Sequence, residues 1–335
     1  MSWAPRRGWG TSLGKVKREL SAVIRTIAKY EPVKVLAPKG VLLREGRHEF
    51  GGYPNIEVIE APIDDIWMRD IAPTFAIRQS GKKREVVAID WNFNGWGGSE
   101  EVVRGNGRPA DIVAKLAGVK CVRAEFSAEG GALIFDGQGT AITTRSCLLN
   151  PNRNPVRPGI DRQQQISNDL RRFGISRTIW LEGDPAEYQT SGHVDGYVLL
   201  APGSRILVET IDDDDMEAPM WRDHDIDTLR RACAGSDRRF KVETIAAPRR
   251  RYWKRASEDF APCYLNAYVA NGAVIGAKFD DLTRDRMAKH VLKSTFPGRE
   301  VVLLNINHLG EGGGGIHCLT QPMPTLRMAM SMDTP

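Results

Sequence analysis

The sequence predicts a single α/β domain built from small repeated units. Its 335 residues are enough for one large domain or two ordinary ones. Pairs of strands followed by one helix and a further strand recur along the chain. No low-complexity linker or abrupt change of composition divides it. We therefore expect one domain that covers residues 1–335.

Two local patterns define the elements of the first half. Apolar residues at helical spacing, such as Leu20, Val23 and Ile24, indicate helices. Apolar runs bounded by turn residues indicate strands. These patterns give a helix over 13–30, a short strand in "YEPVKVLAP", strands over 56–63 and 85–93, a helix over 110–118 closed by Gly118, and a hairpin over 131–144 that turns at 136–139.

The second half repeats the same sequence of elements. Gly174 closes an amphipathic helix, and Asn271-Gly272 is a typical two-residue hairpin turn. The expected elements are a helix over 161–174, strands in "TIWLEG", "GYVLLA" and "RILVET", a helix over 223–235, a hairpin over 264–279, a helix over 284–298 and a strand in "REVVLLNI".

Composition excludes several classes of protein. Hydrophobic residues make up 41% and charged residues 27%, which is typical of globular proteins. The net charge of +5 is mild, and the basic cluster 249–251 has no interleaved aromatic pattern, so we expect no nucleic-acid partner. No apolar run reaches membrane-spanning length, and "MSWAPRRGWG" lacks the apolar region of a signal peptide. We therefore expect a cytoplasmic protein.

The five cysteines are odd in number and widely spaced. No two of them approach a C-x-x-C spacing, so a structural zinc site is not expected. An odd count without a leader segment favours free thiols in a reducing compartment. The thiols are Cys121, Cys147, Cys233, Cys263 and Cys318.

Four polar segments occupy strand ends or turns and supply the candidate site residues. His193 and Asp195, two apart in a predicted strand, would point to one face and line one pocket. The glycine run that includes Gly314 and Gly315 leaves room for a ligand, and its N–H groups would favour a thiolate. The candidates are Trp67 and Asp70 in "DDIWMRDIAP", Glu129 in "SAEGGAL", His193 and Asp195 in "SGHVDGYV", and Cys318 in "GEGGGGIHCLTQPMP".

Each candidate also has a purely structural interpretation. Cys318 could be a small buried apolar residue, which is the usual role of a free cysteine. The other structural interpretations are a surface salt bridge for Asp70 with Arg69, a core aromatic for Trp67, a turn carboxylate for Glu129, and a satisfied polar pair for His193 and Asp195.

Together the candidates are one thiol, one histidine, three carboxylates and a tryptophan. Three carboxylates would oppose a developing oxyanion, so they do not suit a cysteine protease. They suit a planar cation such as a guanidinium, which pairs bidentately with carboxylates. A cysteine can attack the central guanidinium carbon while a histidine transfers protons to the leaving ammonia.

Six segments, in order along nearly the whole chain, resemble the agmatine deiminase family, which includes the bacterial type of peptidylarginine deiminase. The resemblance implies the five-bladed α/β propeller of the guanidine-modifying (pentein) superfamily, made of ββαβ units around a central site. The segments are "DDIWMRDIAPTF", "DWNFNGWGG", "EGGALIFDGQGTAITTRSCLLNPNRNP", "SGHVDGYV", "YLNAYVANGAVI" and "GGGGIHCLTQPMP".

The resemblance also implies a role for each matching residue and requires no metal or organic cofactor. Cys318 would be the nucleophile of a covalent intermediate, and His193 the general acid and base. Asp70 and Asp195 would hold the guanidinium nitrogens, and Glu129 would assist binding and proton handling. Trp67, Gly314 and Gly315 would contact the substrate. A small guanidine is the expected partner, and a homodimer is possible in this family.

The sequence departs from the family pattern just before the histidine. Many agmatine deiminases carry acidic residues there, whereas this chain has Gln189 and Ser191. Glu187 or the acidic run 212–215 could supply a replacement charge. The resemblance as a whole still favours agmatine as the substrate, with peptidyl-arginine or another alkylguanidine as the alternative. A guanidine-binding pseudoenzyme and an amidino transferase are less favoured readings.

Overall fold

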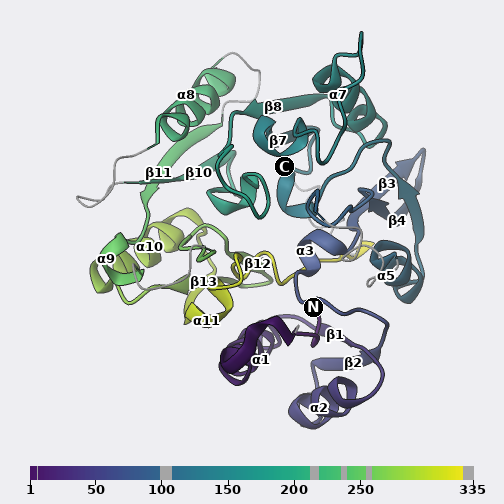
Figure 1. The fold of residues 1–335 in the computed structure, drawn as a ribbon, viewed down its shortest axis with the longest axis vertical. Coiled ribbons are helices and arrows are strands. Elements are labelled where there is room, and N and C mark those ends of the chain that lie inside the picture. Colours follow the sequence, from purple (N-terminus) through teal and green to yellow (C-terminus); the bar gives the residue numbers. More distant parts are fainter. Residues whose placement is uncertain (6, 99–107, 212–218, 235–239, 254–258, 327–335) are drawn as a thin grey trace.

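The computed structural model describes residues 1–5, 7–98, 108–211, 219–234, 240–253 and 259–326. Within these residues, five small sheets stand in a ring and the longer helices lie outside them (Figure 1). Four sheets have three strands and one has two. Each sheet is one blade, so the predicted five-bladed α/β propeller is confirmed.

The four three-stranded blades share one connectivity. Two strands form an antiparallel hairpin, a helix follows, and a third strand returns parallel to the second. The blades are β3 (Thr74–Ser80), β4 (Lys83–Asp90), α5 (Pro109–Ala117) and β5 (Lys120–Arg123); β6 (Ile134–Phe135), β7 (Thr140–Thr144), α7 (Arg162–Arg172) and β8 (Arg177–Leu181); β9 (Val198–Ala201), β10 (Arg205–Thr210), α8 (Met220–Ala234) and β11 (Lys241–Ala246); and β12 (Tyr268–Ala270), β13 (Ala273–Lys278), α10 (Leu282–Thr295) and β14 (Glu300–Asn305).

The first blade is a reduced version of the others. Its strands β1 (Val33–Ala37) and β2 (Ile56–Glu60) pair in parallel and are joined by α2 (Val41–Phe50). The start of the chain takes the place of a hairpin strand: Ser2 bridges Leu36, and the Trp3 N–H donates to the Leu36 carbonyl at 2.7 Å.

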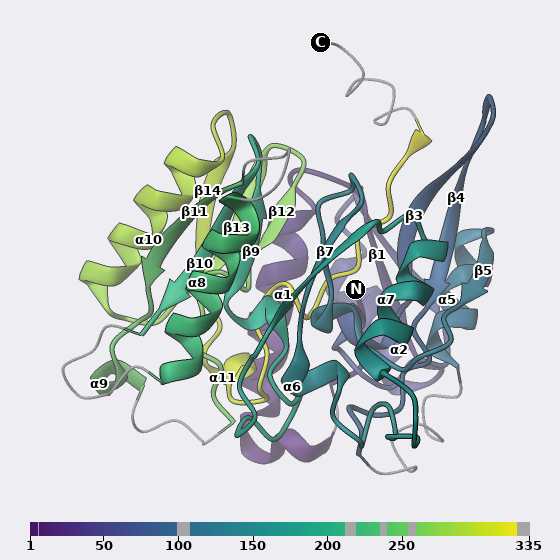
Figure 2. The same cartoon turned by 90° about the horizontal axis from the view of Figure 1, so that it is seen from above.

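Helix α1 (Leu13–Ile27) connects this opening segment to β1 and confirms the first predicted helix. Its apolar residues at helical spacing are fully buried against the blades, as the periodicity predicts. Figure 2 shows α8 and α10 along the outer side of the ring, beside β11 and β14 respectively.

Four elements of the blades were not predicted, and each has a weak sequence signal. Strands β3, β5 and β11 are mostly exposed or half-buried, so their apolar residues do not alternate clearly. Helix α2 contains Gly46, which disfavours a helix. An added Cβ at Gly46 would lie 3.4 Å from the Trp3 ring, so close packing accounts for this glycine.

Short helical turns precede the first strands of three blades. These are α3 (Met68–Ile71) before β3, η2 (Gly130–Ala132) before β6 and η3 (Val194–Gly196) before β9. The expected strand through His193 and Asp195 is therefore wrong, because the chain makes a 3-10 turn there and β9 begins only at Val198. The remaining short helices are η1 (Arg7–Ser12), α6 (Arg145–Leu148), α9 (Arg250–Trp253) and α11 (Asn307–Gly310).

In the described ranges, none of the helices combines the length and the apolar character that crossing a bilayer requires.

Candidate active site

The candidate residues meet because each blade begins near the centre of the ring. Asp70, Glu129 and Asp195 come just before β3, β6 and β9, and Asn266 holds the same place before β12. Cys318 follows the last blade. Trp67, Asp70, His193, Asp195 and Cys318 line one cavity of about 840 Å³. Gly314 lines it as well, whereas Glu129 and Gly315 do not, so six of the eight sequence-predicted residues border the same space.

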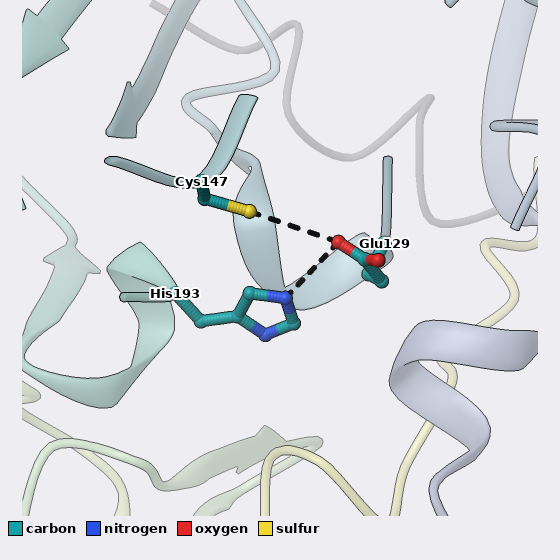
Figure 3. Close-up of side chains that lie close together, drawn as sticks. All are labelled: Glu129, Cys147 and His193. Carbon is teal, nitrogen blue, oxygen red and sulfur yellow. Dashed lines mark hydrogen bonds and ion pairs between the residues drawn. The ribbon is translucent and has the colours of Figure 1, made fainter. Parts of the chain in front are cut away.

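His193 lies among three carboxylates. Its Nε2 is 3.2 Å from Glu129 Oε2 (Figure 3), and its Nδ1 is 3.8 Å from Asp70 Oδ1 and 3.9 Å from Asp195 Oδ1. Although burial disfavours the charged imidazolium, the surrounding acids outweigh it and raise the pKa of His193 well above its usual value. At neutral pH the imidazole therefore carries a proton that it can donate.

Glu129 is held in its ionised form by two basic groups. Its carboxylate is completely buried, and Arg153 Nε donates to Oε1 at 2.8 Å. Burial opposes ionisation, but the hydrogen bond and charge of His193 and the guanidinium of Arg153 lower the pKa of Glu129. The turn-carboxylate interpretation is therefore wrong. Arg153 is a site residue that the sequence pattern did not reveal.

Cys147 is a second thiol at this site. Its buried Sγ donates to Glu129 Oε2 at 3.7 Å, the same oxygen that His193 Nε2 contacts (Figure 3). Glu129, Cys147 and His193 together could ligate a soft metal ion, since their donor atoms lie within 4.8 Å of one another. The guanidinium of Arg153 places a positive charge beside them and opposes a bound cation. That the reaction needs no metal stays a prediction.

Cys318 is enclosed by Asn266, Asp195 and the glycine run. Asn266 Nδ2 donates to Sγ at 3.2 Å, and Asp195 Oδ2 lies 3.7 Å from Sγ. Asn266 was missed by the sequence reasoning. Its place just before β12, the first strand of its blade, is the signal that could have identified it, because three other blades carry a site residue there.

The thiol of Cys318 is protonated when the cavity holds no cation. Burial, followed by the charges of Asp195 and Asp70, raises its pKa well above the usual value. The hydrogen bonds from Gly315 N–H and Asn266 lower it, but by less. The Gly315 N–H acts in the expected direction, since it lowers the pKa of Cys318, but burial and the charges of Asp195 and Asp70 outweigh it and keep the thiol protonated.

Asp70 and Asp195 face the thiol from different blades, and their pKa values shift in opposite directions. Burial raises the pKa of Asp70 to about 6, despite hydrogen bonds from Trp96 Nε1 and Gly131 N–H at 3.0 Å each. Burial also acts on Asp195, but a 2.6 Å hydrogen bond with His317 Nδ1 lowers its pKa. Asp70 is buried, so the surface salt bridge with Arg69 is wrong.

His317, the residue before the nucleophile, positions Asp195 through a hydrogen bond. Its pKa is lowered by burial and by the charge of Arg69, so it stays neutral near pH 7 and donates from Nδ1 to Asp195. Arg69 in turn donates its backbone N–H to the Cys318 carbonyl at 2.9 Å. These contacts fix the turn that carries the nucleophile.

Two glycine segments make close approach possible. A Cβ on Gly131 would lie 2.6 Å from His193 Nδ1 and 2.8 Å from Asp70 Oδ1, so only glycine fits between them. A Cβ on Gly314 would lie 2.5 Å from the Trp67 ring, and one on Gly315 2.5 Å from Asn266 Oδ1. The run therefore packs Trp67 and Asn266 against its backbone. Substrate contact by Gly314 and Gly315 stays a prediction.

The loop before His193 is organised by Glu187. Its two carboxylate oxygens accept hydrogen bonds from the N–H groups of Gln189, Thr190 and Gly192 and from the Thr190 hydroxyl. These contacts lower the pKa of Glu187, with burial opposing them. Glu187 borders the cavity, but its oxygens are already engaged. The alternative acidic run 212–215 lies outside the described residues.

Comparisons with known proteins agree with this geometry. The model of the Porphyromonas-type peptidyl-arginine deiminase family matches residues 1–324. A protein of Pseudomonas fluorescens SBW25 named agmatine deiminase is 34% identical, covering 90% of this chain and 86% of its own. One of Pseudomonas putida F1 with the same name is 35% identical, covering 90% and 85%. The structure of the Enterococcus faecalis agmatine deiminase superposes with a TM-score of 0.80 at 26% identity, covering 97% and 92%.

Proposed function

We propose that this chain, which belongs to the Porphyromonas-type peptidyl-arginine deiminase family, is an agmatine deiminase. It converts agmatine and water to N-carbamoylputrescine and ammonia. The observation that carries the chemistry is the placement of the Cys318 thiol 3.7 Å from Asp195, in one cavity with Asp70 and His193. The relatives named above support agmatine as the substrate.

Substrate binding completes the charge balance of the site. Asp70 and Asp195 hold the nitrogens of the planar guanidinium, each accepting hydrogen bonds from it. Trp67 lies along the alkyl chain. The bound cation offsets the two negative charges that raise the pKa of Cys318, so the thiol releases its proton to solvent as the substrate binds.

The reaction then proceeds in two displacements. The Cys318 thiolate attacks the guanidinium carbon, and His193 donates its proton to the departing ammonia. Glu129 keeps the imidazole oriented through the contact at Nε2. Neutral His193 next takes a proton from water, which attacks the amidino-thioether carbon and releases the ureido product and Cys318. The proton on His193 is thereby restored.

An ammonia-release screen tests this function. Agmatine, free arginine, an arginyl peptide and butylguanidine are incubated with the protein and with Cys318→Ala. We expect the highest kcat/KM with agmatine and no turnover by the variant. Citrulline formation in the peptide without activity on agmatine would assign the peptidyl-arginine alternative, and full turnover by Cys318→Ala would refute the covalent mechanism.

We infer that residues 1–335 form one catalytic domain, because the site residues come from the segments before β3, β6, β9 and β12 and from the segment after β14. We expect the reaction to occur in the cytoplasm, since all five cysteines are free. Absence of a nucleic-acid partner and a homodimeric state remain predictions of the sequence.

A further inference from the structure

Besides Asp70 and Asp195, one more fully buried carboxylate of the described chain lines the cavity. Glu209, at the end of β10, lines the cavity and is 3% exposed. Its Oε2 accepts from the N–H groups of Tyr264 at 2.8 Å and Leu265 at 3.3 Å, and from the Cys263 thiol at 3.2 Å. Among the described residues, no basic side chain forms an ion pair with it. All of its donors are therefore neutral.

Glu209 is tied closely to the catalytic groups. Its N–H donates to the carbonyl of Tyr197, two residues after Asp195, at 2.8 Å. Tyr264, which donates to its carboxylate, stands two residues before Asn266, the partner of the Cys318 thiol. Two residues of chain span at most about 7 Å. Glu209 and Cys318 also line the same cavity, so one molecule bound there can contact both groups.

The surroundings of Glu209 lack a full positive charge at its oxygens. Burial raises its pKa to about 7, and the thiol of Cys263, the charge of Arg222 and the N–H groups of Tyr264 and Leu265 offset burial only in part. Arg222 donates to the backbone carbonyl of Glu209, not to its carboxylate, while its guanidinium covers the rings of Tyr197 and Trp221. A buried carboxylate without a cation is costly. An ammonium group would supply the missing charge.

Other acids on the cavity wall are less suited to this role. The oxygens of Glu187 already accept four hydrogen bonds from its own loop. Asp184 accepts from the Ala186 N–H at 2.9 Å. Asp259 has one buried oxygen without a partner, but the residue as a whole is only half-buried. Glu209 is the fully buried acid of this group.

We propose that Glu209 binds the distal ammonium group of the substrate and thereby selects agmatine over guanidines that lack a second cation. The inference rests on the proposed function and adds its specificity-determining residue. It also accounts for the missing acids at Gln189 and Ser191: the second charge is recognised from β10, on the blade that carries Asp195, and not from the loop before His193.

The test compares agmatine with butylguanidine, which has the same chain but no ammonium group. Glu209→Gln keeps an oxygen acceptor for Tyr264 and Leu265, so we expect it to fold. We expect kcat/KM for agmatine to fall about 10- to 100-fold, mainly through KM, because a charged hydrogen bond is lost. Activity on butylguanidine should change less than about twofold. Glu125→Gln, an exposed residue outside the cavity, is the matched control for one lost negative charge.

The pH dependence of KM gives a second readout. A proton on Glu209 competes with the ammonium group, so KM for agmatine should rise as pH falls below about 7. Asp70, whose pKa is about 6, contacts the guanidinium of both substrates, so its protonation should raise both KM values alike. The ratio of KM for agmatine to KM for butylguanidine should therefore rise as pH falls below about 7, and Glu209→Gln should abolish the change in this ratio. A purely structural role of Glu209 would instead change both substrates alike.

The outcomes separate the inference from the function. If Glu209→Gln keeps the preference for agmatine, or if Asp259→Asn removes it instead, the inference is overturned and the deiminase stands. If the unmodified protein turns over butylguanidine as well as agmatine, the inference is overturned while guanidine hydrolysis stands. If it turns over neither, the proposed function itself fails.

Discussion

Two buried glutamates on neighbouring blades have opposite electrostatic surroundings, and their pKa values shift in opposite directions. Glu129, ahead of β6, is ion-paired with the equally buried Arg153 and contacts His193. Glu209, on β10, meets only neutral donors at its carboxylate. Burial acts on both, yet the pKa of Glu129 is lowered and that of Glu209 is raised to about 7. The partner, and not the depth of burial, decides the charge.

This difference matches the two tasks of the cavity. The histidine needs a permanent negative charge beside it, so the fold supplies the counter-charge of Glu129 from within the protein. The far end of the cavity needs a site that is completed only by the substrate, so its carboxylate has no internal cation. The following predictions test this distinction, from the largest expected effect to the smallest.

Glu129→Gln should lower kcat for agmatine by about 10²- to 10⁴-fold, because the acid–base histidine loses the charge that keeps it protonated and oriented. KM should change little, which is the reverse of the effect expected for Glu209→Gln. Steady-state ammonia release on folded protein, checked by circular dichroism, measures both. A variant with normal kcat and raised KM would assign Glu129 to binding alone.

Arg153→Met should destabilise the protein by about 3–5 kcal/mol, since it leaves a fully buried carboxylate without its cation. Urea unfolding measures the loss. Arg145→Met is the control, because the pair of Arg145 with Glu182 is partly exposed and should be worth about 1 kcal/mol or less. Equal losses for the two variants would contradict the importance of the Glu129 pair.

The stability contributed by Glu209 should depend on pH with a sign opposite to that of Glu129. The folded state keeps a proton on Glu209 up to about pH 7, whereas the unfolded chain loses it near 4.5. The folded state therefore binds more protons in this window, and stability falls as pH rises.

For Glu129 the lowered pKa has the reverse effect, and stability falls as pH drops through its folded value. Glu209→Gln should consequently gain about 3 kcal/mol relative to the unmodified protein between pH 4.5 and 8. Urea unfolding of both proteins at the two pH values measures this. A constant difference would show that Glu209 titrates normally.

Gly131→Ala should cost about 1–3 kcal/mol and reduce activity, because a methyl group has no space between His193 and Asp70. Gly52→Ala is the control, since an added Cβ there meets no atom within 4 Å. It should stay within about 0.5 kcal/mol of the unmodified protein. Unfolding curves and kcat for both variants decide whether the Glu129 side of the cavity is as tightly packed as the distances indicate.

The sequence anticipated the blades and most reacting groups because these depend on local patterns. Periodicity and turn residues predicted the full order of hairpin, helix and strand for the blades β6–β8 and β12–β14, whereas β3, β5 and β11 lack a clear alternation and were missed. The segments around Asp70, Glu129, His193 and Cys318 are continuous and distinctive, so their resemblance to a known family could be read directly.

Tertiary structure alone decided which residues from separate segments come into contact. Arg153, Cys147 and Asn266 lie within segments that resemble the family, but no local pattern indicated that they would contact Glu129 and Cys318. The chain start likewise replaces a strand in the first blade. Gly131 is required only because three side chains from two other segments converge on it.

The two glutamates give the physical reason. Nothing in the residues beside Glu129 or Glu209 tells which one has a cation nearby, since the decisive groups come from other parts of the ring. The charge of a buried acid depends on its neighbours in space, and those neighbours are fixed only when the ring closes.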